Sequence, residues 1–289
     1  MNIIRQVASS IVKFKYMKRI IFYFCIAFGI SLANTVYHIP IEGTIDLGLP
    51  PFIERSIAEA EENNAKAIIF EVNTFGGRVD AATQIKDAIL DSKVPTVAFI
   101  NKRAISAGAL ISLSCEKVFM AGGATIGATT AVDMQGNKAS EKVISYMREE
   151  MAATAEKRGR DKYIARGMVD EELEFPNKVM KEFINDGEVI DTIKTKVYYL
   201  VIDGDTVTVD DIEGRKQGNL ITLTTEQSLK YKIADASIEN FEAVLDTLGF
   251  SNLVVNKTTE NWSENFVRFL TNPVVASLLT TFGFLGILF

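Results

Sequence analysis

The chain has 289 residues, 47% of them apolar, which is enough for one large domain with appended segments. Its formal charge is −6, from 31 basic and 37 acidic residues, and the central region holds no dense basic cluster, which excludes the electrostatic signature of a nucleic-acid-binding protein. One histidine, His38, and two cysteines, Cys25 and Cys115, fit no metal-ligand spacing, so we expect neither a metal nor another cofactor.

The N-terminus has the order of a secretory signal. Basic residues precede an apolar run, Ile20–Leu32, and small residues ending at Ala33 offer a cleavage site. The apolar run is short for a membrane-spanning helix, which favours a cleaved leader over an anchor. We therefore predict a signal peptide over residues 1–33. Its removal takes away Cys25 and leaves Cys115 without an intrachain partner.

Short apolar runs then alternate with segments of helical spacing. The runs that predict strands are Thr35–Ile41, Ala67–Val72, Val94–Ile100 and Lys117–Met120. The intervening helices are predicted over Leu49–Asn64, over Val79–Leu90 and after Ser106. Three strand–helix units in succession predict an α/β domain over residues 34–256 with a largely parallel sheet, and functional groups in such sheets gather at the carboxyl ends of the strands.

Two motifs fall at such strand ends. Ser106 follows the third predicted strand and precedes the small residues Ala107 and Gly108. A serine at a strand-to-helix switch can expose its hydroxyl while a backbone N–H approaches a developing oxyanion, so Ser106 is a candidate nucleophile; an ordinary helix N-cap is the alternative. Gly76 and Gly77 follow the second strand, where paired glycines form either an oxyanion loop or a simple turn.

The general base for such a serine is expected to be a lysine. His38 lies in a strand-like segment beside the leader, where a structural role is favoured over a catalytic one. Lys142 stands near the start of a helix predicted over Ser140–Arg158. A lysine that acts as a base needs partial burial, because desolvation lowers the pKa of a lysine. Spacing alone leaves open a solvated surface role for Lys142, and leaves Lys138 and Lys157 as equal candidates.

The pattern beyond residue 174 is less regular. Asp203–Asp205, between two apolar runs, predicts a β-hairpin. Thr224–Gln227 predicts the capped start of a short helix. The sequence contains no internal repeat and no low-complexity tract.

The C-terminus ends in the run Phe269–Phe289, which carries no charge. About 20 apolar residues suffice to cross a bilayer, so we predict a transmembrane segment over 269–289, with a buried hairpin or an interfacial helix as the alternative. Trp262 and Arg268 precede it, where an interfacial aromatic residue and a snorkelling cation are expected. Residues 257–268 are predicted to form a polar linker. Either the protein ends in the membrane or the sequence is part of something longer.

Several separated motifs occur in the order typical of a known family. They are Ala65–Gly77, Ala104–Gly108, Met120–Ala128, Arg158–Arg160 and Leu223–Asp235. Over Thr35–Asp235 the sequence resembles the NfeD family of membrane-bound serine proteases, which belong to the ClpP/crotonase superfamily and are related to signal peptide peptidase A. The resemblance implies a ClpP/crotonase-like α/β fold and a serine–lysine dyad.

The motifs carry the family's functional residues onto this chain. The resemblance implies Ser106 as nucleophile, Lys142 as base, and an oxyanion hole in the Gly76–Gly77 loop, with the backbone N–H groups of Gly77 and Ala107 as donors. The chain departs from the family pattern at Phe75, where proline is frequent, and this alters the oxyanion loop or a neighbouring substrate subsite. Longer members continue into several membrane helices and a small C-terminal β-barrel.

These inferences together predict an exported, membrane-tethered serine endopeptidase with its protease domain outside the cytoplasm. The expected substrate is an extended peptide from an apolar or membrane-proximal segment. Stomatin-like membrane proteins are typical partners in the family, and self-association, as a dimer, is expected. The rival prediction is a catalytically silent membrane scaffold that recruits such proteins. Acyl-CoA chemistry, a third possibility for the crotonase fold, fits poorly with export and gives no role to Ser106.

Overall fold

The computed structural model describes residues 35–132, 136–171, 181–185, 188–193, 199–202, 205–208 and 218–288. The predicted signal peptide over residues 1–33, including Cys25, lies outside the described residues.

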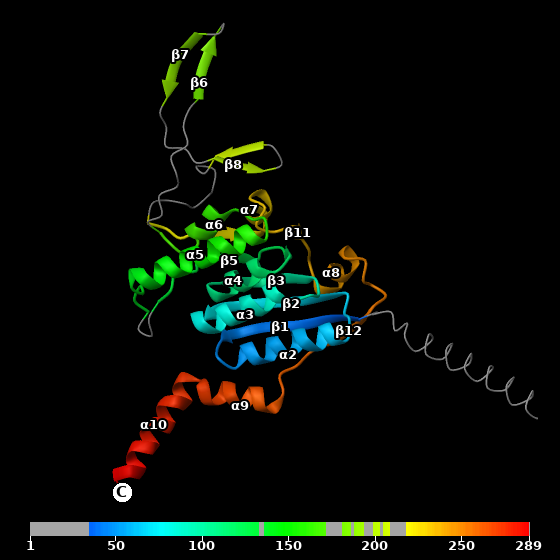
Figure 1. Ribbon diagram of the computed structural model, residues 1–289, viewed down its shortest axis with the longest axis vertical. Coiled ribbons are helices and arrows are strands. Elements are labelled where there is room, and N and C mark those ends of the chain that lie inside the picture. The colour runs from blue at the N-terminus through cyan, green and yellow to red at the C-terminus, as the bar shows by residue number, and fades with distance from the viewer. Residues whose placement is uncertain are drawn as a thin grey trace, which may run out of the picture. The chain divides into compact units, whose positions relative to one another are not determined.

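An eight-stranded sheet forms the centre of the domain (Figure 1). Its strands are β1 (Thr35–Ile45), β2 (Ala67–Gly77), β3 (Thr96–Ile105), β4 (Lys117–Met120), β5 (Thr125–Gly127), β10 (Thr222–Thr224), β11 (Ala236–Ser237) and β12 (Val254–Lys257). The order is β10-β5-β3-β2-β1-β12, and β4 pairs with both β3 and β11. Every pairing is parallel except that between β10 and β5, which confirms the predicted α/β class with a largely parallel sheet.

Helices cover both faces of this sheet (Figure 1). Helices α2 (Leu49–Glu62), α3 (Val79–Asp91), α4 (Ala107–Ser114) and α5 (Glu141–Lys157) pack on one face, and α8 (Phe241–Thr247) packs on the other. Side chains alternate between the faces: Ile68 and Phe70 of β2 join the first core, and Ile69 joins the second. Burial on both faces explains the continuous apolar runs that predicted the strands. The shorter helices are α6 (Lys162–Gly167) and α7 (Thr225–Lys230).

Strand β2 is longer than predicted. Beyond Val72 it continues to Gly77 and pairs with the end of β1, although its register with β1 shifts between Glu42 and Thr44. Its register with β3 shifts between Val72 and Asn73. These bulges let the polar, glycine-containing end of β2 remain paired at the carboxyl edge of the sheet.

Two local predictions are confirmed. Strands β8 (Tyr199–Ile202) and β9 (Asp205–Thr208) pair as an antiparallel hairpin, and the two residues between them lie outside the described part of the chain. Thr224 caps α7 in a reciprocal arrangement with Gln227. A second antiparallel pair, β6 (Lys181–Asn185) with β7 (Glu188–Ile193), was not predicted.

The C-terminal region differs from its prediction. The segment predicted as a polar linker over 257–268 includes the end of β12 and most of helix α9 (Trp262–Thr271), and the apolar run over 269–289 is divided between α9 and α10 (Pro273–Leu288). Pro273 explains the division, because proline interrupts helical hydrogen bonding and forces the preceding residue, Asn272, into an extended conformation. Among the described residues, no single helix is both long and apolar enough to cross a membrane; α9 and α10 meet that test together, as a pair bent by 70°.

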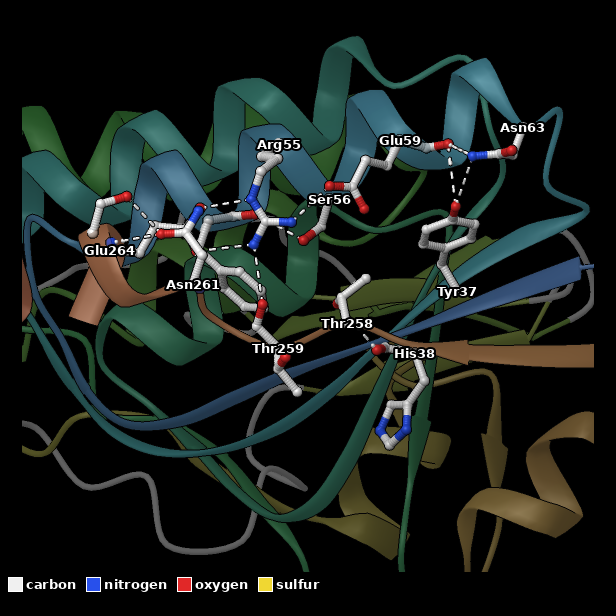
Figure 2. Close-up of polar contacts among 12 residues, drawn as sticks. Tyr37, His38, Arg55, Ser56, Glu59, Asn63, Thr258, Thr259, Asn261 and Glu264 are labelled. Carbon is white, nitrogen blue, oxygen red and sulfur yellow. Dashed lines mark hydrogen bonds and ion pairs between the residues drawn. The ribbon is translucent and has the colours of Figure 1, made fainter.

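Helix α9 is bound to the domain through its polar side. Arg55 of α2 donates two hydrogen bonds to the carboxylate of Glu264, at 2.7 and 2.9 Å (Figure 2). Glu264 also accepts from the backbone N–H of Asn261, at 2.7 Å, and closes a capping box at the start of the helix. Arg268 pairs with Asp46, at 3.0 Å, so it contacts the domain instead of snorkelling along an apolar segment as predicted.

The Arg55–Glu264 pair makes the docking of α9 sensitive to acid. Hydrogen bonding from Arg55 holds the pKa of Glu264 below its usual range, so the carboxylate stabilises the docked helix at neutral pH and loses that contribution as the pH falls through its lowered pKa. Because Trp262 is the single tryptophan of the chain, its fluorescence anisotropy reports on α9. We expect the anisotropy to stay constant down to about pH 4 and to fall below it.

The variant Glu264→Gln keeps the shape of the side chain but removes its charge. We expect it to weaken docking at pH 7 by roughly 1.5–3 kcal/mol, the range for a hydrogen bond to a charged group, and to make the acid transition smaller than in the wild type. Glu242→Gln on α8, at an exposed glutamate away from α9, should leave the wild-type transition unchanged. An identical acid transition in Glu264→Gln would contradict this assignment.

Candidate active site

Ser106 has an unusual backbone conformation. It precedes α4 with φ +57° and ψ −118°, a region that non-glycine residues rarely adopt. Its side chain makes no capping hydrogen bond to the helix, so the N-cap interpretation does not account for it. The backbone is held on both sides: Ser106 N–H donates to the carbonyl of Gly127 at 2.9 Å, and its carbonyl accepts from Ala109 N–H at 2.9 Å. The hydroxyl of Ser106 is therefore not used to cap α4.

Gly76 lies directly against Ser106. A Cβ at position 76 would stand 2.6 Å from the Cβ of Ser106 and 3.1 Å from its Oγ, and Gly76 has φ +105°. The lack of room for a Cβ beside Ser106 and the positive φ of residue 76 therefore both require glycine. The structure brings together two of the residues that the sequence singled out.

Thr74 holds this loop in place, and sequence reasoning missed it. Its buried hydroxyl donates to the carbonyl of Gly43, at 2.5 Å, and accepts from the N–H of Gly76, at 2.9 Å. The N–H of Gly76 is therefore already engaged within the protein. A threonine two residues before a glycine pair is the available signal, since short hydroxyl side chains bond nearby backbone groups.

The two predicted oxyanion donors are the residues that directly follow Gly76 and Ser106 in the chain. Gly77 is the last residue of β2 and pairs with Ile45 of β1. Ala107 is the first residue of α4, so its N–H has no acceptor within the helix and lies at the positive end of the helix dipole. An N–H group in this position is suited to an anionic oxygen.

His38 is a structural residue remote from this edge. Its ring is buried, contacts Glu71 Oε2 at 2.8 Å and stacks on Phe241 with 4.1 Å between ring centroids. Hydrogen bonding to His38 and Asn101 lowers the pKa of Glu71. On β1, His38 precedes Ile45 by seven residues, a distance of roughly 23 Å along a strand.

Cys115 does not supply an alternative nucleophile. It is free and fully buried at the end of α4. Burial raises the pKa of its thiol to about 12, so it holds its proton at neutral pH. Among the described residues, no group of three or more His, Cys, Asp and Glu side chains is arranged to hold a metal ion.

Lys142 lies in the first turn of α5 and is exposed in the single chain, whereas a lysine base needs partial burial. Tyr146 follows it by one helical turn on the same face of α5. Tyr146 lines an open groove of about 610 Å³ with the residues that come directly after Gly77, namely Arg78, Val79 and Asp80, and with Thr83 and Gln84 of α3. Tyr146, on the same face of α5 as Lys142, therefore borders a groove whose other lining residues follow Gly77 in the chain.

The other two lysines are placed differently. Lys138 forms an ion pair with Glu171, with 3.0 Å between Nζ and Oε1. Lys157 ends α5, about 22 Å along the helix from Lys142. The adjacent Arg158 donates to the carbonyl of Ser114 at 2.7 Å, at the opposite end of α4 from Ser106.

Phe75, which precedes Gly76, forms a cation–π pair with the half-buried Arg103. The ring of Phe75 is 73% exposed, and the Arg103 guanidinium lies 4.4 Å from its centroid. The residue that departs from the family pattern is therefore a large aromatic surface next to the glycine loop.

The Gly76–Ser106 contact predicts an asymmetric response to two similar substitutions. Gly76→Ala forces both a positive φ and an overlap with Ser106, so we expect a loss of roughly 2–5 kcal/mol of stability. Gly123→Ala is the matched control: Gly123 has φ +77° with no atom within 4 Å of the place that a methyl group would take, and the expected loss is about 1 kcal/mol. Thermal unfolding followed by circular dichroism measures the difference, and equal losses would contradict the contact.

The protein-family model that describes the N-terminal domain of NfeD1b matches residues 35–188 of this sequence. Membrane protein NfeD1b of Bacillus subtilis is 33% identical over 254 residues, which cover 88% of this chain and 50% of that protein. Membrane-bound protease PH1510 of Pyrococcus horikoshii is 27% identical over 267 residues, which cover 89% of this chain and 53% of that protein. The chain thus spans about half the length of these curated relatives.

Solved structures of the 1510-N membrane-bound stomatin-specific protease share the fold. A lysine-to-alanine mutant in complex with a substrate peptide aligns with a TM-score of 0.60 and 23% identity over 83% of this chain and 99% of that chain. A serine-to-alanine mutant aligns with a TM-score of 0.57 and 23% identity over 79% and 99%. Since the NfeD1b model covers more than half of the 289 residues, the chain belongs to the family of the NfeD1b N-terminal domain.

Proposed function

We propose that this chain is a membrane-tethered serine endopeptidase with Ser106 as nucleophile and Lys142 as general base. The observation that carries the proposal is the strained Ser106, packed against Gly76 and followed by the unpaired start of α4. A hydroxyl held beside a glycine loop and a helix N-terminus is the arrangement that acyl transfer requires.

In the proposed reaction the Oγ of Ser106 attacks the scissile carbonyl while the neutral amine of Lys142 accepts the hydroxyl proton. The N–H groups of Gly77 and Ala107 donate to the oxyanion of the tetrahedral intermediate. The lysine ammonium then returns the proton to the leaving amine as the peptide C–N bond breaks, which leaves an acyl-enzyme on Ser106. Water, deprotonated by the same lysine, attacks the ester carbonyl; the bond between the acyl carbon and Oγ then breaks, and the lysine ammonium returns the proton to Oγ, which releases the second product and restores Ser106.

The placement of α5 supports Lys142 over the other lysines. Lys142 shares a helix face with Tyr146, which lines the groove together with the residues that follow Gly77. Lys157 lies at the opposite end of α5, and Lys138 is paired with Glu171. We propose that a peptide bound in this groove covers Lys142 and supplies the desolvation that its exposure in the single chain lacks.

The relatives support the same class of reaction. The 1510-N structures include mutants in which a serine and a lysine are replaced by alanine, one of them with a substrate peptide bound. The B. subtilis relative is a membrane protein, and PH1510 is a membrane-bound protease. By analogy we propose a peptide substrate and a stomatin-like partner. From the predicted leader and the apolar C-terminal run we further propose an extracytoplasmic protease domain that acts on apolar or membrane-proximal segments, and we propose that it works as a dimer.

Cleavage of an apolar fluorogenic peptide by the full chain tests the dyad. We expect Ser106→Ala and Lys142→Ala each to lower kcat/KM by about 10³-fold or more with unchanged thermal unfolding, and activity to rise with pH because the attack needs an unprotonated amine. Lys157→Ala, at the other end of the same helix, is the matched control and should retain wild-type activity.

Labelling with a fluorophosphonate separates the two residues. Wild-type protein should be labelled at Ser106, Ser106→Ala should not be labelled, and Lys142→Ala should react more slowly. If Lys138→Ala rather than Lys142→Ala is inactive, the base has been assigned wrongly. An inert wild type between pH 6 and about 9, where lysines begin to deprotonate, would reject the enzyme in favour of the scaffold.

A further inference from the structure

Helix α9 is amphipathic, but its polar side faces the protein and its apolar side faces outward. Glu264 and Arg268, one turn apart, both contact the domain. Trp262, Phe266 and Phe269 lie on the opposite face, with exposed fractions of 81%, 51% and 56%. A surface helix of a soluble domain normally shows the reverse arrangement.

The polar side is docked closely and specifically. Arg55 binds Glu264 through two nitrogens and also donates to the carbonyl of Thr259, at 3.0 Å (Figure 2). At the other end, a Cβ on Gly48 would stand 2.2 Å from Cγ of Arg268 and 3.0 Å from its backbone nitrogen, so the two backbones approach as only glycine allows. Helix α9 therefore has a defined orientation on α2.

The outward face of α9 carries aromatic side chains and no charged residue. Both charged residues within α9 are neutralised on the inner side: Glu264 binds Arg55, and Arg268 binds Asp46 and Glu260. A protein partner recognised by charge would find nothing to pair with on the outer face. Tryptophan and phenylalanine are instead the residues that settle at the boundary between lipid headgroups and acyl chains.

The following helix continues this apolar surface. Residues 273–288 of α10 contain no charged residue, and Val274, Phe282 and Ile287 are each more than 60% exposed. Helix α9 is joined to α10 through Asn272 alone, so any bilayer that receives α10 meets the outer face of α9 within one residue. Because the apolar surface continues from α9 into α10, lipid is the occupant that best fits the aromatic face.

We propose that α9 is an interfacial helix: its face of Trp262, Phe266 and Phe269 lies in the headgroup boundary of a bilayer, and its polar face fixes the α2 side of the domain toward that membrane. The binding is apolar, so it does not depend on anionic lipids or on salt. The proposal concerns orientation and does not rest on peptidase chemistry.

The single tryptophan provides the test. The full chain is reconstituted in phosphatidylcholine vesicles, and the emission of Trp262 is measured with lipids brominated either near the headgroup or near the chain end. We expect a blue-shifted emission, quenched more strongly by the shallow bromines and unchanged by added salt or by phosphatidylglycerol. In the double variant Phe266→Ser/Phe269→Ser the quenching should be lost while the protein stays on the vesicles through α10. Val254→Ser, at another exposed apolar side chain, should behave as wild type.

Each other outcome overturns the proposal. Absence of quenching in vesicle-bound wild type means that the aromatic face stays in water. Quenching that appears only when protein is diluted means that a second copy covers the face. Stronger quenching by the deep bromines places α9 within a membrane span, and unchanged quenching in the double variant means that the two phenylalanines do not hold it in lipid.

Discussion

The candidate site depends on one contact in which there is no room for a methyl group. Gly76 at the end of β2 lies against Ser106 at the end of β3, and the parallel pairing of these strands brings both to the same edge. The hydroxyl of Thr74 holds the loop from within by bridging Gly43 and Gly76. The position of Ser106, the proposed nucleophile, is thus set by strand register and by two hydrogen bonds, which is the rigid support that a reacting group needs.

The two members of the proposed dyad are held very differently. Ser106 is built into the sheet edge with a strained backbone, whereas Lys142 stands on an exposed first turn of α5. Only the first is pre-organised in the single chain. Under the proposed mechanism, a peptide bound along the groove at Arg78 and Tyr146 would supply the burial that Lys142 lacks.

Sequence patterns were sufficient for the strand–helix alternation, because strands buried on both faces leave uninterrupted apolar runs. They correctly placed Gly76 and Ser106 at one edge of the sheet. They could not predict that Lys142 is exposed, because the exposure of a side chain depends on tertiary packing. At the C-terminus, β12 was missed because only four residues pair, and α9 because its apolar positions merged with the run that follows. Pro273 was the available signal for the break.

Strand β12 pairs in parallel with β1, so Thr35 lies beside Val254 in the finished sheet. Among the strands that the structure describes, the first in chain order is therefore flanked on one side by the last. Until residue 257 has left the ribosome, β1 keeps an open edge of backbone N–H and C=O groups that can pair with other chains. The sheet edge at β1 closes only after β12 has been made, and a chain shortened before β12 would carry that edge permanently, with aggregation as the expected consequence.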